Sequence, residues 1–161
     1  MIRSLPRFVE TLGVLLRERL RTSAYTLGVL TRDQIEARLR TALAAQGDVG
    51  AAYLFGSVAR GTAKRTSDVD VGVLLTTDPP RTVGGLRLGL EGELERALGL
   101  PVQIVVLNRA PCDLIHRVLR DGILLLDRHP GARIRFEVDA RNRYFDLQPF
   151  LRRYRRLDVP A

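Results

Sequence analysis

The chain is poor in cysteine and has no tryptophan. Cys112 is the single cysteine among 161 residues, so a disulfide within the chain is excluded, and a reducing compartment such as the cytoplasm fits best. No apolar run approaches the roughly 18–20 residues of a membrane span. Charged residues also interrupt the leucine-rich N-terminus. We therefore expect neither a membrane segment nor a secretion signal.

Lysine is almost absent as well. Lys64 is the only one, so arginine supplies nearly all of the basic side chains behind the net charge of +8. Such a basic chain suits contact with polyphosphates, nucleic acid or an acidic partner protein, and charge alone does not separate these three. With 45% hydrophobic residues, the chain is long enough to form one domain with a substantial core.

The apolar pattern alternates between helical and strand spacing. Strand-like runs occur at 50–55, 69–75 and 102–107, followed later by a short apolar segment at 123–126. Helical spacing occurs at 4–21, 31–47, 86–98, 111–120 and 136–154. A capping box of Thr31 and Gln34 begins the second helix, Gly47 ends it, and Pro149 should kink or split the last one. This order predicts an α/β fold, a small mixed β-sheet with helices packed on it.

Two sequence features next to the first two strands point to chemistry. Gly56 and Ser57 form a turn after the first strand, and Asp68 and Asp70 occupy positions i and i+2 of the next apolar run. Side chains two residues apart lie on the same face of a strand, roughly 6.5–7 Å apart. Both carboxylates can therefore bind one divalent cation or two adjacent ones. Three residues of the same run are expected to point into the core: Val69, Val71 and Val73.

These residues belong to the run GSVARGTAKRTSDVD, which also contains Arg60, Gly61 and Ser67. The run resembles the signature of the DNA-polymerase-β-like nucleotidyltransferase superfamily, and within it the minimal nucleotidyltransferase (MNT) family. The resemblance implies the polymerase-β-like fold and transfer of a nucleoside monophosphate from a nucleoside triphosphate. It implies Mg²⁺ as the metal and ATP as the nucleotide. On this basis 31–161 is the nucleotidyltransferase domain with C-terminal helices, and 1–30 is an N-terminal helical extension.

The resemblance also assigns roles to single residues. Gly56 and Ser57 would cradle the triphosphate, and Asp68 and Asp70 would hold Mg²⁺ as the catalytic carboxylates. Arg60 is a candidate for phosphate contact, with a solvated helix arginine as the alternative.

Other polar residues have less specific signals. Ser67 is a candidate for nucleotide binding but fits a role in organising the turn before the first carboxylate better. Lys64 is expected to be a solvated side chain. His116 is a possible base for an acceptor hydroxyl, with an ordinary helix residue favoured. For Cys112 a small, partly buried residue is favoured over a nucleophile.

The third strand carries the main departure from the family pattern. Active members usually have a third carboxylate there, which helps bind the metal and prepares the attacking hydroxyl. The layout places Gln103 at that position. Glutamine is uncharged and cannot act as a general base, a contribution typically worth ~10²–10⁴-fold in rate. We therefore expect transfer to be weakened, while binding of metal and nucleotide survives.

The remaining sequence bears on the acceptor. Only about 50 residues follow the third strand, too few for a separate acceptor domain. The MNT resemblance implies a partner instead. The chain would be the antitoxin of a HEPN-type ribonuclease toxin, adenylylating a toxin tyrosine if active, or neutralising the toxin by binding alone. A small-molecule or RNA nucleotidyltransferase is the third hypothesis.

The C-terminal segment 128–156 gives physical support for a partner. It contains nine arginines and three acids, with aromatic residues between them. Arginine and aromatic side chains are favoured at protein interfaces and also in RNA contacts, of which we favour the protein. The alternative is that the aromatic residues pack on the sheet and the arginines lie in water.

Overall fold

The computed structural model describes residues 30–64, 66–77 and 84–157. Within them, β1 (Val49–Phe55), β2 (Val69–Leu75), β3 (Val102–Val106) and β4 (Ile123–Asp127) form one sheet in the order β3-β2-β1-β4. β1 pairs antiparallel with β2 and β4, and β2 pairs parallel with β3. The mixed sheet confirms the expected fold class, and the short apolar segment after the third strand is itself a strand.

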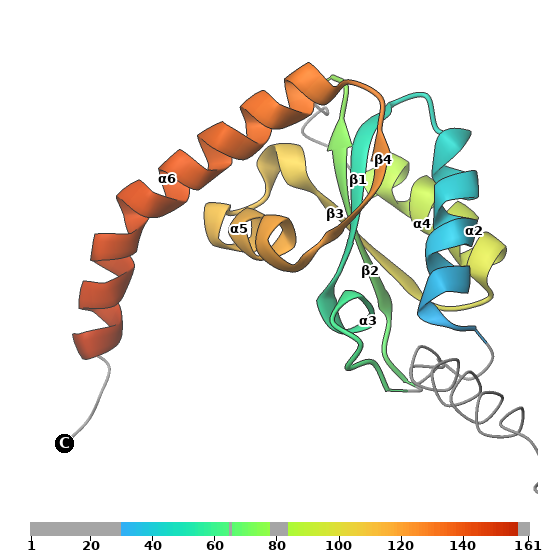
Figure 1. The fold of residues 1–161 in the computed structure, drawn as a ribbon, viewed down its shortest axis with the longest axis horizontal. Helices are drawn as coiled ribbons and strands as arrows, with labels where there is room; N and C mark the ends of the chain where they lie inside the picture. The colour runs from blue at the N-terminus through green and yellow to red at the C-terminus, as the bar shows by residue number, and fades with distance from the viewer. Residues whose placement is uncertain (1–29, 65, 78–83, 158–161) are drawn as a thin grey trace, which may run out of the picture.

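Helices cover both faces of the sheet (Figure 1). On one face lie α2 (Arg32–Ala44) and α4 (Gly84–Leu98), and on the other lie α5 (Cys112–Asp121) and α6 (Pro130–Leu157). A one-turn helix, α3 (Gly56–Ala59), follows β1, and a 3-10 turn, η1 (Leu107–Arg109), follows β3. Among the residues that the structure describes, no helix combines the length and apolar composition needed to cross a membrane.

Local signals fix most helix ends. The capping box is confirmed, because the Thr31 hydroxyl accepts from the Gln34 N–H at 3.3 Å and the Gln34 side chain accepts from the Thr31 N–H at 2.9 Å. The prediction that Gly47 ends this helix is wrong. α2 ends at Ala44, because the N–H of Ala45 bonds back to carbonyls of the last turn without a left-handed residue. α4 does end at a glycine in the left-handed region, Gly99, with φ of 69°.

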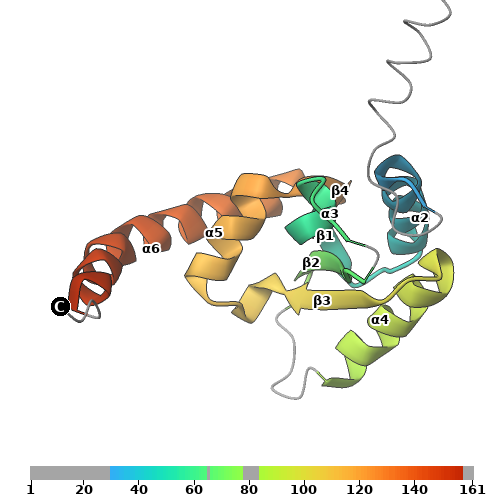
Figure 2. The same ribbon diagram turned by 90° about the horizontal axis from the view of Figure 1, so that it is seen from below.

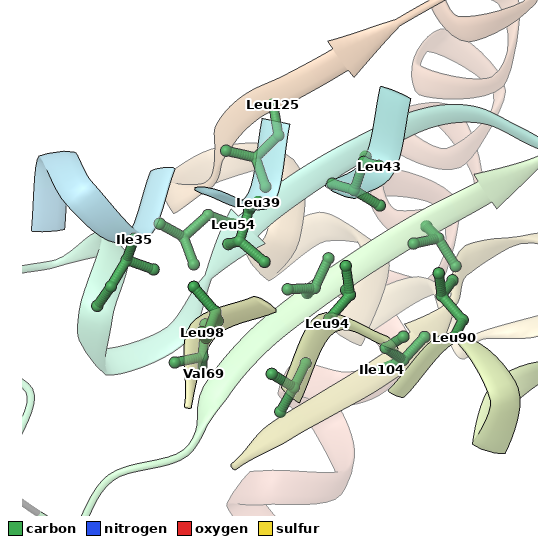
Figure 3. Packing of buried hydrophobic residues seen from close by; sticks show 14 of the residues in the cluster. Ile35, Leu39, Leu43, Leu54, Val69, Leu90, Leu94, Leu98, Ile104 and Leu125 are labelled. Carbon is green, nitrogen blue, oxygen red and sulfur yellow. The ribbon is translucent and has the colours of Figure 1, made fainter. Parts of the chain in front are cut away.

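The larger core lies between the sheet and the α2–α4 layer (Figure 3). The three valines of β2 are fully buried in it, as alternation predicts. Leucines at helical spacing on α2 and α4 meet them from the other side, which explains why the sequence folds these segments against this face. The largest fully buried side chains here are Ile35, Leu39, Leu43, Leu54 and Leu94.

A polar network attaches the first part of α6 to the other face. The Tyr53 hydroxyl on β1 donates to Glu137 at 2.8 Å. Arg133 donates to Glu137 at 2.5 Å and to Asp127, at the end of β4, at 2.9 Å. Burial and the adjacent Glu137 carboxylate raise the pKa of the Tyr53 phenol, so it stays a donor.

The two edge strands are covered by side chains of the α2–α4 layer. Glu95 and Glu91 of α4 accept from the backbone N–H groups of Val102 and Ile104, at 3.1 and 3.0 Å. Arg40 of α2 donates to carbonyls of β4 at 2.6 and 2.9 Å. These bonds satisfy edge groups that would otherwise invite pairing with another chain, and those to β3 hold the strand that carries Gln103.

Pro149 lies inside the last helix without ending it. α6 continues through Pro149, so of the two expected outcomes, a kink or a split, the split is wrong, and the axis of α6 turns in its outer part (Figure 1). A proline lacks only one N–H, and the hydrogen bonds on either side preserve the helix. α6 extends away from the sheet past α5 (Figures 1 and 2). The helix expected at 4–21 lies outside the described residues, as does most of the loop before α4.

Candidate functional site

The turn after β1 is pressed against the second carboxylate. Gly56 has a φ of 74°, in the region that favours glycine. A Cβ added there would lie 1.9 Å from Asp70 Oδ2, closer than any side chain tolerates. Phe55, the preceding residue, is the register partner of Asp70 across the β1–β2 pair. The sequence therefore needs glycine here for both its backbone conformation and the close approach of β2.

The two aspartates lie at the start of β2. Asp68 precedes the strand and is exposed, whereas Asp70 is half-buried within it. Burial raises the pKa of the Asp70 carboxyl, the negative charge of Asp68 raises it further, and the positive charge of Arg60 opposes both. The two carboxylates, two residues apart at the start of β2, therefore interact electrostatically.

Gln103 lies beside the second carboxylate. In the parallel β2–β3 pair, Asp70 is the register partner of Gln103, and register partners share a face of the sheet. The Gln103 side chain is exposed. Among the described residues, no group of three or more His, Cys, Asp or Glu side chains suits a metal ion. The site therefore offers two carboxylates and an amide oxygen.

The segment between turn and carboxylates is organised by its own hydrogen bonds. The Ser67 hydroxyl accepts from the backbone N–H of Lys64 at 2.9 Å, and the Ser67 N–H donates to the Lys64 carbonyl at 3.0 Å. Ser67 thus does what the turn-organising interpretation expects. The carbonyl of Ser57 accepts from the N–H of Thr62 at 2.9 Å, which closes the loop after α3. Lys64 is exposed, as expected.

Arg60 interacts electrostatically with two acids. It follows α3 and is exposed, and its charge favours the ionised forms of both Asp70 and Asp121. A cation held at this position beside the glycine turn can meet a phosphate group.

Asp121 is a nearby acid that the sequence analysis missed. It is the last residue of α5 and accepts two hydrogen bonds from Arg120, at 2.7 and 2.6 Å. These bonds, then the charges of Arg120, Arg60 and His116, lower its pKa. The signal lies in topology rather than in a motif: α5 ends where β4 begins, and β4 pairs with β1 beside the glycine turn.

Two further residues have structural surroundings. His116 stacks on Tyr144 with ring centroids 3.7 Å apart and planes 3° from parallel, so it joins α5 to α6 as an ordinary helix residue would. Cys112 is half-buried in the first turn of α5. Neither lies in the group formed by the glycine turn and the two aspartates.

The donor set fits a hard divalent cation. Carboxylate and amide oxygens are the ligands that Mg²⁺ accepts in proteins, and the missing Cβ at Gly56 lets the turn and the Asp70 carboxylate lie in close contact. Asp68 and Asp70 would hold the ion. Gln103 is uncharged, so the site offers the cation one negative charge fewer than a site with three carboxylates would.

Comparison with protein families gives one match. A model described as polymerase beta, nucleotidyltransferase, matches residues 37–130. The matched range contains the glycine turn, both aspartates and Gln103. No curated protein matches the chain.

Solved structures of toxin–antitoxin complexes are similar to this chain. One, a toxin–antitoxin with AMP-PNP, is 28% identical with a TM-score of 0.60, and the match covers 78% of this chain and 95% of that one. Another, an MntA–HpeT toxin–antitoxin in which two aspartates are replaced by glutamate, is 26% identical with a TM-score of 0.61 and covers 78% and 95%.

A third solved structure is a tri-AMPylated Shewanella oneidensis HEPN toxin in complex with MNT antitoxin. It is 23% identical with a TM-score of 0.60, and the match covers 77% of this chain and 95% of that one. At this identity the likeness shows the fold alone.

Proposed function

The chain belongs to the polymerase beta nucleotidyltransferase family, and on this premise we propose that it is an antitoxin that transfers AMP from ATP to a tyrosine hydroxyl of a HEPN-type toxin. The relatives at 26–28% identity come from toxin–antitoxin complexes, one of them with the ATP analogue AMP-PNP. These support both the partner and the nucleotide. The single cysteine supports action in the cytoplasm.

One observation carries the proposal: the strand register brings the glycine turn, Asp70 and Gln103 to one end of the sheet. Nucleotidyl transfer needs positioning and charge neutralisation more than covalent help. A turn whose backbone approaches phosphates, two carboxylates for a cation and an arginine beside them meet those needs.

In the proposed reaction, the tyrosine oxygen attacks the α-phosphorus of ATP. A new P–O bond forms, the bond between the α-phosphorus and its bridging oxygen to the β-phosphate breaks, and pyrophosphate leaves with that electron pair. Gly56 and Ser57 orient the triphosphate, and Arg60 offsets charge on the leaving group. Asp68 and Asp70 would hold Mg²⁺, which when bound would neutralise charge on the phosphate oxygens. The phenolic proton passes to water, because Gln103 cannot accept it.

A second candidate is neutralisation by binding alone, with the catalytic site impaired. Gln103 beside Asp70 is the observation that favours it, because an uncharged amide neither adds charge at the metal nor takes a proton. A third candidate is transfer to a small molecule or RNA. It is disfavoured because the described residues after β3 form only η1, α5, β4 and α6, with no second domain.

The test is mass spectrometry of a HEPN-type toxin incubated with this chain, ATP and Mg²⁺. We expect added AMP on a tyrosine, and its loss with Asp70→Asn but not with Asp113→Asn, an exposed acid of α5. Gln103→Asp should raise the rate. Toxin neutralised without added mass would favour the binding protein, and transfer to free RNA or an aminoglycoside without a partner would overturn the proposal.

A further inference from the structure

Arg60 lies next to the candidate site without a direct ion pair. Its backbone is fixed, because its N–H donates to the Gly56 carbonyl at 3.2 Å and the residue after it, Gly61, has a left-handed φ of 69°. Its side chain is exposed and pairs with no carboxylate among the residues that the structure describes. Charges at longer range therefore decide where this guanidinium lies.

The carboxylates of the candidate site attract Arg60. Asp70 is half-buried, and the positive charge of Arg60 favours its ionised form, while Asp68 adds a second negative charge. A guanidinium that settled on these oxygens would compete with Mg²⁺ for them, because its planar fork matches a carboxylate. An arginine that is to meet phosphate therefore needs an opposing charge on its other side.

Asp121, the last residue of α5, supplies that opposing charge. Its side chain is 22% exposed, and its carboxylate interacts electrostatically with Arg60. The two hydrogen bonds from Arg120 fix the orientation of this carboxylate. The same bonds lower its pKa, so Asp121 stays ionised at neutral pH.

The junction of α5 and β4 fixes where Asp121 lies. Ile123, the first residue of β4, is the register partner of Leu54 on β1. A Cβ added to Gly122 would lie 2.3 Å from the carbonyl oxygen of Val118 and 3.4 Å from that of Leu54. The absence of a side chain at this glycine therefore lets α5 end directly against the end of β1.

The two acids flank the glycine turn from opposite sides. β2 and β4 pair with opposite edges of β1, so Asp70 of β2 and Asp121 before β4 lie on either side of the turn that follows β1. The one-turn helix α3, which Arg60 follows, lies at this same end of the sheet (Figure 1). Arg60 is thus attracted from both sides.

Resting on the proposed function, we infer that Asp121 is a positioning residue: it holds the Arg60 guanidinium on the α5 side of the glycine turn, off the carboxylates that bind Mg²⁺. There the guanidinium can meet the β- and γ-phosphates, the part of ATP that leaves as pyrophosphate. Asp121 touches neither nucleotide nor metal. It acts through Arg60, as supporting residues orient the groups that bind a ligand.

Asp121 is not suited to replace the carboxylate that is missing at Gln103. Hydrogen bonds from Arg120 occupy both of its oxygens. A base whose pKa lies far below that of a phenol also accepts the phenolic proton poorly. Its surroundings therefore support a role toward Arg60 rather than toward the acceptor.

The test measures the affinity of the full chain for MgATP and for magnesium pyrophosphate by titration calorimetry. For Asp121→Asn we expect both affinities to fall ~3–10-fold, because Arg60 moves toward Asp70. Asp113→Asn is the matched control, since Asp113 is the other acid of α5 and pairs with Arg117 at 3.8 Å from the first turn of the helix. It should bind both ligands as the wild type does.

A double-mutant cycle separates positioning from a structural role. Arg60→Gln should weaken MgATP binding at least as much as Asp121→Asn does, and combining the two should add no further loss, because Asp121 acts through Arg60. Asp121→Glu retains the charge and should recover most of the affinity. Asp121→Ser also removes the charge and is the second variant should Asp121→Asn unfold.

Thermal midpoints without ligand are measured for every variant, and Asp121→Asn should match Asp113→Asn. Unchanged affinity in Asp121→Asn, or a further loss when it is added to Arg60→Gln, overturns the positioning role, while AMP transfer by the wild type still supports the proposed function. A wild type that binds no MgATP overturns both.

Discussion

The two faces of the sheet differ in what they hold. The face toward α2 and α4 is closed by aliphatic side chains, with the three valines of β2 at its centre. The face toward α5 and α6 has a smaller apolar cluster, a buried tyrosine bonded to a glutamate, and the half-buried Asp70. β2 contributes to both, because successive side chains point to opposite faces. β2 thus contributes its valines to the larger core and Asp70 to the candidate site on the opposite face.

This difference explains how the fold accommodates two neighbouring carboxylates. Burial and a second negative charge disfavour the ionised form of Asp70, so the charge on this carboxylate costs stability unless a cation is present. The larger apolar cluster on the opposite face offsets this cost through its buried area, at ~25 cal/mol per Å². The variants below test this division.

The largest effect is expected from the aliphatic face. Leu94→Ala removes a fully buried side chain and should lower the free energy of unfolding by ~2–5 kcal/mol in denaturant titrations. Leu88→Ala, on the same helix but exposed, should change it by less than ~0.5 kcal/mol. Equal losses for the two would mean that α4 does not pack as described.

Gly56→Ala tests the contact between the turn and Asp70. The added Cβ would lie 1.9 Å from the carboxylate oxygen in a backbone conformation that alanine rarely adopts. We expect a loss of ~1–3 kcal/mol in the free energy of unfolding, with ATP binding lost as Asp70 is displaced. Gly89→Ala is the control, since a Cβ on that glycine of α4 meets nothing within 4 Å. Retained ATP binding in Gly56→Ala would contradict the close approach.

Tyr53→Phe probes the polar anchor of α6. The change leaves Glu137 without one donor, and we expect ~1–2 kcal/mol less stability toward denaturant. Tyr144→Phe is the matched control: its hydroxyl has no hydrogen-bond partner among the described residues, so its loss should cost little. A similar loss in both variants would show that the anchor does not depend on the Tyr53 hydroxyl.

Local patterns predicted much of the fold. The alternation of apolar and polar residues in β2 predicted the burial of its valines, and the capping box predicted the start of α2. Both patterns depend on residues a few positions apart. The proximity of Gln103 to Asp70 followed from the family layout, and the β2–β3 register agrees with it.

The features that escaped prediction depend on distant parts of the chain. Asp121 lies near Arg60 only because β4 pairs with β1, and nothing around residue 121 signals that pairing. The anchor from Tyr53 to Glu137 spans 84 positions. Spacing on α6 identified a helix, but whether Phe145 packs or faces water depends on where the body of the protein ends.

The smallest stability effect, and the sharpest test of the two-face comparison, is the pH dependence of Asp70→Asn. The pKa of Asp70 in the folded protein is raised above the ordinary aspartate value of 3.8, so the folded protein binds this proton more readily than the unfolded chain does. The resulting destabilisation is fully present at neutral pH, shrinks as the pH falls through the folded pKa, and is gone below about 3.8.

Without Mg²⁺, Asp70→Asn should therefore be slightly more stable than the wild type at pH 7 and equal to it at pH 3. Addition of Mg²⁺ should reverse the order at pH 7, because a cation that binds only the folded wild type stabilises it in proportion to the logarithm of its concentration. Thermal melts of both proteins at pH 7 and pH 3, each with and without Mg²⁺, give the difference in thermal midpoint in all four conditions. Val71→Ala, the neighbour on the aliphatic face, should be destabilised equally in all four conditions. If the thermal midpoint of Asp70→Asn were lowered equally in all four conditions, as for Val71→Ala, then Asp70 would be a structural residue of β2 rather than a charged residue of the candidate site.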